Sequence, residues 1–158
     1  MTGAKQKAHD PPQKHQRILI IEDEKELLEF VERYLIDAGY EVLSASDGMT
    51  GLQLARDSDP SLILLDVMLP KLNGFTICRL LKYDELYKHI PIVMWTWREE
   101  DEDRRMGMYA GADVYIPKPF SIGKLLESIV ALIGQPPRTS NQSFTEAAEK
   151  AADKPKRI

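Results

Sequence analysis

Polar side chains follow four short apolar runs of this 158-residue chain, each at the position where the run ends. They are the side chains of Glu22, Asp23, Asp66, Thr96 and Lys118. If the runs are parallel strands of one sheet, their carboxyl ends meet at one edge and the side chains converge there. Three carboxylates, one hydroxyl and one ammonium would then share a single pocket.

Carboxylates held this closely need a counter-charge. Two of them about 4 Å apart repel by roughly 4 kcal/mol at an effective dielectric constant of about 20, so one is protonated or a cation lies among them. A few carboxylates, with positions left open for water and a phosphate, suit Mg²⁺ better than Ca²⁺ or Zn²⁺. An ionised aspartate beside Mg²⁺ can act as a nucleophile towards phosphorus. Thr96 and Lys118 are suitable donors to the phosphoryl oxygens.

Asp66 follows Leu62–Leu65, an unbroken apolar run between Pro60 and Pro70 that indicates a strand buried on both faces. Such strands belong to parallel sheets covered by helices, and their carboxyl ends open onto the ligand crevice. A carboxylate here either caps the following loop or meets a ligand. The convergence of the other four polar side chains favours the ligand.

Five apolar runs alternate with five segments in which apolar residues recur at helical spacing. The expected strands are Arg17–Ile21, Glu41–Ala45, Leu62–Leu65, Ile92–Trp95 and Val114–Ile116. This alternation predicts an α/β fold, a flavodoxin-like, doubly wound, five-stranded parallel sheet in the order 2-1-3-4-5 with five helices. In that order the switch point lies between the first and third strands, so Asp23 and Asp66 border the same crevice.

Several other residues have structural interpretations. Gly39 and Gly111 are expected to end helices. Trp95 and Cys78 are expected in the core, Cys78 as a small apolar residue rather than a redox centre. The five acids of Glu99–Asp103 lie at a helix start, where the helix dipole favours them, and are expected to form a mainly solvated face.

The formal net charge of −4 is unevenly distributed. Residues 1–17 carry +3 and residues 135–158 carry +2, so the segment between them carries −9. An acidic body argues against direct nucleic-acid binding by the domain. The single cysteine excludes an intrachain disulfide and indicates a reducing compartment. No run approaches the roughly 20 apolar residues of a membrane helix, and residues 1–16 lack the apolar region of a secretory signal. We therefore expect a cytoplasmic protein with no membrane contact.

We expect one domain, at residues 17–134, between two tails. Residues 1–16 have no apolar periodicity and are expected to be disordered. Residues 135–158 contain a capping box, Ser143–Glu146, that is followed by alanines on one helical face. This C-terminal tail is either disordered or a short helix, because an isolated helix of its length is marginal in water.

The motifs that carry most of this chemistry are Ile21–Glu24, Leu65–Pro70, Thr96 and Gly111–Phe120. In their order and spacing they closely resemble the receiver domain of bacterial two-component response regulators, over about residues 17–134. The resemblance implies that Asp66 accepts a phosphoryl group from a sensor histidine kinase or phosphotransfer protein, in a phosphorelay that requires Mg²⁺. It also implies a signalling domain that catalyses its own phosphotransfer and dephosphorylation, rather than an enzyme.

The resemblance assigns roles to the residues around the acceptor. Catalysis of phosphotransfer would rest on Asp66, Lys118 and Thr96. The magnesium ligands would be Asp23, Asp66 and the backbone carbonyl of Met68, with Glu22 acting through water. The phosphate-binding groups would be Lys118, Thr96 and the backbone N–H groups of Val67 and Trp97. The switch residues would be Thr96, which swings to the phosphate, and Tyr115, which turns inward behind it. The Lys118–Pro119 peptide bond would be cis.

Three positions depart from the family pattern. Glu22 stands where an aspartate is commoner, which should not remove metal binding. Trp97 stands where the residue is usually small, and its indole either packs on the surface or forms a lid over the site. Val114 replaces an acid, and the last helix has Lys124 but no arginine. These features argue against the charged dimer face of the winged-helix subfamily, although a weak homodimer stays open.

Output would come from an unidentified protein that binds the face made by the fourth helix, fifth strand and fifth helix. Two other classes compete with this interpretation. A phosphohydrolase of the haloacid dehalogenase type needs a second acid two residues after its nucleophile, where this chain has Met68. A pseudo-receiver would bind partners without phosphorylation, which the intact acidic pair, Asp66, Thr96 and Lys118 argue against. From the residues alone, Thr96 also fits a hydroxyl bonded to backbone, and Tyr115 a packing residue.

Overall fold

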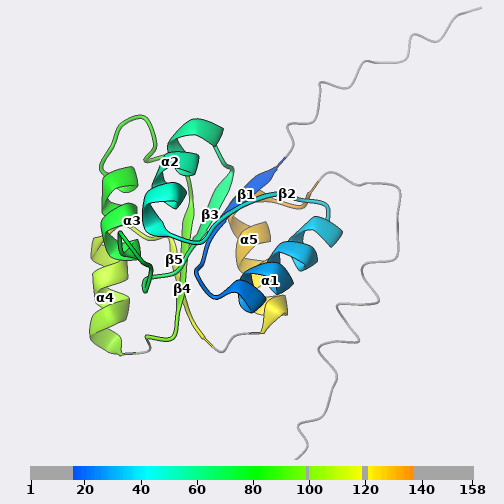
Figure 1. The fold of residues 1–158 in the computed structure, drawn as a ribbon. Helices are drawn as coiled ribbons and strands as arrows, with labels where there is room; N and C mark the ends of the chain where they lie inside the picture. The colour runs from blue at the N-terminus through cyan, green and yellow to red at the C-terminus, as the bar shows by residue number, and fades with distance from the viewer. Residues whose placement is uncertain (1–15, 99, 119–120, 137–158) are drawn as a thin grey trace, which may run out of the picture.

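Five parallel strands form a single sheet in this computed structural model, in the order β2-β1-β3-β4-β5 (Figure 1). The structure describes residues 16–98, 100–118 and 121–136. The strands are β1 (Arg17–Ile21), β2 (Glu41–Ala45), β3 (Leu62–Leu65), β4 (Ile92–Thr96) and β5 (Val114–Pro117). The predicted strands and their order are confirmed.

Helices cover both faces of the sheet. They are α1 (Lys25–Asp37), α2 (Gly48–Ser58), α3 (Gly74–Lys82), α4 (Asp101–Tyr109) and α5 (Ile122–Ile133). Helices α1 and α5 lie on one face, and α2, α3 and α4 lie on the other (Figure 1). The predicted doubly wound, flavodoxin-like α/β fold with five helices is therefore confirmed.

Alternate residues of the central strands pack against opposite helical layers. In β1, Ile18 and Ile20 contact the layer of α1 and α5, whereas Leu19 and Ile21 contact the layer of α2, α3 and α4. The same alternation occurs along β3, where all four residues are 0 % exposed. Because both faces are buried, these strands have unbroken apolar sequences. Each buried side chain stabilises the fold by about 1.5–3 kcal/mol.

Local capping defines where the helices begin and end. The side chains of Asp47, Asn73 and Ser121 each accept a hydrogen bond from the backbone N–H three residues later, at the starts of α2, α3 and α5. Gly39 and Gly111 follow α1 and α4 with φ angles of 102° and 95°, a region that favours glycine. The expected helix ends at these glycines are confirmed.

The start of α4 differs from the sequence-based expectation at one acid. Asp101 and Glu102 are exposed, but Asp103 is only 4 % exposed and its carboxylate lies 2.8 Å from the guanidinium of Arg98. The prediction of a solvated acidic face is wrong at this position. Asp103 lies on the inner side of the first turn, where the preceding loop supplies a counter-charge.

Some sequence-based predictions fall outside the described residues. These are the disorder of the N-terminal tail, the capping box at Ser143–Glu146 and the conformation of the bond to Pro119. Within the described ranges, none of the helices combines the length and the apolar character needed to cross a bilayer. Trp95 and Cys78 are both 0 % exposed, as expected for core residues.

Substitution of Gly74 by alanine tests how tightly the loop after β3 is packed against the end of that strand. A Cβ atom at this position would lie 2.1 Å from the backbone oxygen of Asp66, which cannot move independently of its strand. We expect Gly74→Ala to reduce the free energy of unfolding by about 1–3 kcal/mol, measured by urea denaturation.

Gly123→Ala is the matched control, because nothing lies within 4 Å of the added Cβ in helix α5. It should be neutral or stabilising by up to about 1 kcal/mol. Equal stabilities of the two variants would contradict the close packing at Gly74.

Candidate functional site

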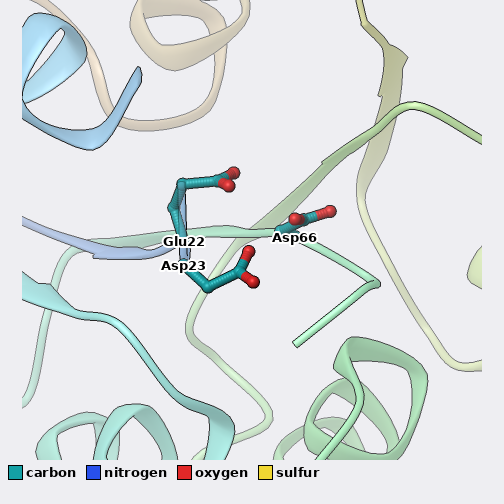
Figure 2. A group of neighbouring side chains, drawn as sticks. All are labelled: Glu22, Asp23 and Asp66. Carbon is teal, nitrogen blue, oxygen red and sulfur yellow. The ribbon is translucent and has the colours of Figure 1, made fainter. Parts of the chain in front are cut away.

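Three carboxylates gather at the carboxyl ends of β1 and β3. Each of Glu22, Asp23 and Asp66 offers an oxygen atom, and these oxygens all lie within 4.8 Å of one another (Figure 2). The two strands are neighbours, with Ile21 in register with Leu65, so the residues after them are adjacent. Glu22 and Asp66 are buried, whereas Asp23 is exposed. The predicted placement of Asp23 and Asp66 beside each other, at the ends of the first and third strands, is therefore confirmed.

Lys118 brings a positive charge to the carboxylates from the end of β5. Its Nζ atom lies 2.7 Å from Glu22 Oε2 and 3.6 Å from Asp66 Oδ2, and the residue is 2 % exposed. The Lys118 backbone N–H donates to the Thr96 carbonyl, which fixes the chain at the strand end. The motif at the end of β5 indicated Lys118, but its close pairing with Glu22 depends on side-chain geometry and could not be predicted from the sequence.

Two indoles flank the ammonium of Lys118. The Nζ atom lies 4.9 Å from the ring centroid of Trp95 and 5.8 Å from that of Trp97. Both distances allow a cation–π attraction. Trp95 is buried in the core, but Trp97 is 59 % exposed. The side chain of Trp97 therefore borders the pocket and still presents much of its surface to solvent.

The carboxylate of Asp66 is surrounded by donors. Burial raises its pKa, and this effect is opposed by the charge of Lys118, by the backbone N–H groups of Met68 and Val67, and by the Thr96 hydroxyl. The Met68 N–H donates to Asp66 Oδ1 at 3.4 Å. The structure thus brings Val67, Thr96 and Lys118 to the aspartate, and their roles in binding a phosphate stay predictions.

Burial also raises the pKa of Glu22, from 4.5 to about 7. The hydrogen bond from Lys118 opposes this shift, whereas the negative charge of Asp66 reinforces it. The Glu24 backbone N–H donates to Glu22 Oε1 at 3.1 Å, so both carboxylate oxygens of Glu22 have partners. One ammonium does not balance three carboxylates when all of them are ionised, so the pocket then carries excess negative charge and favours either a proton on Glu22 or a bound cation.

The donor set fits a hard divalent cation. All three candidate ligands are carboxylates, and the exposure of Asp23 leaves access for water. Oxygen ligands with open positions are the environment that Mg²⁺ prefers. The acidic group is consistent with a metal site. The roles predicted for the Met68 carbonyl and the Trp97 N–H require a bound metal or phosphate and stay predictions.

The two expected switch residues share a partner that the sequence did not reveal. The Arg98 backbone N–H donates to Thr96 Oγ1 at 3.4 Å, and the Tyr115 hydroxyl donates to the Arg98 carbonyl at 2.7 Å. Tyr115 is 7 % exposed, so its ring points inward. Arg98 also forms an ion pair with Asp103. The opposite charges of these two residues were the only sign of this pair in the sequence, and nothing in the sequence indicates that Asp103 is buried.

The chain matches the model of one protein family and several curated proteins. A profile of the response regulator receiver domain matches residues 18–130. The DNA-binding transcriptional regulator RpaA of Synechocystis sp. is 43 % identical over 117 residues, which are 74 % of this chain and 48 % of that protein. The alkaline phosphatase synthesis regulator PhoP of Bacillus subtilis is 38 % identical over 75 % of this chain and 49 % of that protein. The chain thus spans about half the length of these curated relatives.

Solved structures of receiver domains and of a chemotaxis protein are similar to this chain in fold. The receiver domain of sensor histidine kinase PA1611 from Pseudomonas aeruginosa has a magnesium ion in its active-site cleft. It matches with a TM-score of 0.70 and 30 % identity, covering 77 % of this chain and all of that one. The chemotaxis protein CheY4 of Vibrio cholerae matches with a TM-score of 0.70 and 30 % identity, covering 75 % of this chain and 99 % of that one.

The raised pKa values predict how stability depends on pH without metal. Between pH 4.5 and about 7 the folded protein retains a proton on Glu22 that the unfolded chain has released. This contribution to stability is complete below pH 4.5 and is lost as the pH rises through about 7. Melting temperatures in EDTA should therefore fall between about pH 5 and about pH 8, and this fall should be smaller in Glu22→Gln.

Magnesium should reverse the trend, because it binds the ionised carboxylates of the folded state. We expect Mg²⁺ to raise the melting temperature more at about pH 8 than at about pH 5. A magnesium effect that is independent of pH would argue against ionised carboxylates as its ligands.

Proposed function

Because the chain belongs to the receiver domain family of two-component response regulators, we propose that Asp66 accepts a phosphoryl group from a sensor histidine kinase or phosphotransfer protein. The observation that carries this proposal is the position of Asp66, buried beside Lys118 and within 4.8 Å of the oxygens of Glu22 and Asp23. The domain is a phospho-accepting signalling unit rather than an enzyme that turns over a separate substrate.

In the proposed transfer a carboxylate oxygen of Asp66 attacks the phosphorus of a phosphohistidine. The P–N bond breaks, its electron pair stays on the imidazole, and an acyl phosphate forms on Asp66. Asp23, Asp66 and the Met68 carbonyl would hold Mg²⁺, with Glu22 acting through water. The bound ion would offset the negative charge of the phosphoryl oxygens.

Protein donors would hold the remaining phosphoryl oxygens. One such donor is Lys118, whose ammonium already lies 3.6 Å from Asp66 Oδ2. The Thr96 hydroxyl and the Val67 N–H already act on the Asp66 carboxylate. The Trp97 N–H would complete the set. Fixed donors of this kind stabilise charge on the transferring group without reorganising.

Hydrolysis of separate phosphoesters is not supported by the site. A phosphohydrolase that uses an aspartate nucleophile needs an acid two residues later to protonate the leaving group, and this chain has Met68 there. The thioether has no proton to donate. We therefore place the chemistry at a single transfer to Asp66, followed by loss of the phosphoryl group to water.

For the output, we propose a change in the face formed by α4, β5 and α5 that an unidentified partner protein binds. Support comes from Tyr115, which lies on β5 and is hydrogen-bonded to the loop before α4. The matched relatives are named as transcriptional regulators, but this chain spans about half of their length. Their DNA binding is therefore not assigned to it.

Acetyl phosphate with Mg²⁺ should label wild-type protein with one phosphoryl group, measured by intact mass. Asp66→Asn should not be labelled, because its amide cannot attack phosphorus. Asp57→Asn is the control, since Asp57 is an exposed acid on α2, away from the site. Equal labelling of Asp66→Asn and wild type would rule out Asp66 as the acceptor.

Trp97 offers a second prediction, on access to the acceptor. Its exposed indole lies 5.8 Å from Lys118 Nζ at the pocket, so Trp97→Ala should speed labelling by acetyl phosphate several-fold. Tyr109→Ala removes another exposed aromatic ring, which is 80 % exposed on α4, and should not change the rate. Equal rates for wild type and Trp97→Ala would show that the indole does not restrict entry.

A further inference from the structure

Arg98, in the loop between β4 and α4, uses its main chain and its side chain to join three elements. Its N–H donates to Thr96 Oγ1 at 3.4 Å, and its carbonyl accepts from the Tyr115 hydroxyl at 2.7 Å. Its guanidinium lies 2.8 Å from Asp103 Oδ1, in the first turn of α4. Arg98 therefore links the end of β4, the middle of β5 and the start of α4.

The ion pair with Asp103 is positioned to hold this loop in one place. The Asp103 side chain is only 6 % exposed, and within residues 16–98, 100–118 and 121–136 its one ion-pair partner is Arg98. A buried carboxylate without its cation is strongly unfavourable. On its other side the guanidinium lies 4.0 Å from Met68 Sδ, so it also reaches the loop after β3. The ion pair with the buried Asp103 is thus the main contact that holds the Arg98 guanidinium.

The inward position of Tyr115 depends on the same loop. Its hydroxyl donates to the Arg98 carbonyl. Its ring fills the space beside Gly107, where an added Cβ would lie 2.8 Å from Tyr115 Cδ2. Outward rotation of the ring would break the hydrogen bond to Arg98. Any interaction that fixes the main chain at Arg98 therefore favours the inward ring.

We propose that the Arg98–Asp103 ion pair positions Thr96 and Tyr115 for phosphorylation, by fixing the main chain to which both side chains are hydrogen-bonded. The inference rests on the proposed function, in which these two residues respond to the phosphoryl group on Asp66. Arg98 is a positioning residue, because it acts through Thr96 and Tyr115. The pair orders the loop in advance, so less of the binding energy of the phosphoryl group is spent on ordering it.

Beryllofluoride, a mimic of the phosphoryl group, provides the test. Wild type and variants are titrated with it in the presence of Mg²⁺, and the change in tryptophan fluorescence is followed, since Trp97 lies beside the pocket. Asp103→Asn and Arg98→Gln should each weaken the apparent affinity about fivefold or more. Lys88→Gln, which breaks the exposed Lys88–Glu85 pair, should leave the affinity unchanged.

A double-mutant cycle separates positioning from general destabilisation. If the ion pair acts through the loop that holds Tyr115, Asp103→Asn should add little to the loss already caused by Tyr115→Phe. Fully additive losses would overturn the inference. Affinities that stay at the wild-type value in both Asp103→Asn and Arg98→Gln would overturn it as well.

A further variant distinguishes weaker binding caused by displacement of the Tyr115 ring from weaker binding caused by unfolding. Gly107→Ala favours the helix locally but fills the space of the Tyr115 ring, so it should weaken beryllofluoride binding without lowering the helical content. Unchanged affinity in this variant would overturn the role of the inward ring.

If wild type itself neither binds beryllofluoride nor is labelled at Asp66, the proposed function fails and this inference fails with it.

Discussion

The burial of Lys118 with the carboxylates of Glu22 and Asp66 is the interaction on which the rest of this structure depends. Its ammonium is 2.7 Å from Glu22 and 3.6 Å from Asp66, and all three residues are at most 3 % exposed. Removing charged groups from water is costly unless they are paired. Here the pairing is incomplete, because one cation faces three acids. A pocket with this imbalance favours a divalent cation and the phosphoryl group that such a cation stabilises.

The fold places these groups together because both faces of the sheet are apolar and the polar groups lie at its carboxyl edge. Glu22 and Asp66 are adjacent because β1 and β3 are paired, and Lys118 reaches them from β5, two strands beyond β3. The central strands β1, β3 and β4 are almost entirely buried, whereas the side chains that would act lie at the carboxyl ends of strands or directly after them. Thr96, at the end of β4, and Tyr115, on β5, are both hydrogen-bonded to the main chain of Arg98 in the loop after β4, so this loop connects the site to the β5 surface.

Much of this was predictable from the sequence, because the strands are short apolar runs with polar residues directly after them. Asp66, Thr96 and Lys118 could be placed at one edge once the strand order was inferred. Two features were not predictable. Asp103 belongs to an acidic helix start that resembles a solvated face, yet it is buried against Arg98. The contact of Lys118 with Glu22 also depends on side-chain geometry between distant segments, which local patterns do not encode.

Residue-specific magnesium binding is the most direct test of whether the clustered carboxylates hold a divalent cation. Backbone amide resonances of the folded, metal-free protein are followed by NMR as Mg²⁺ is added. We expect saturable shifts that are largest at residues 22–24 and 66–69, beside the clustered carboxylates. Absence of saturable shifts there, or shifts centred instead on the exposed acids at the start of α4, would contradict this expectation.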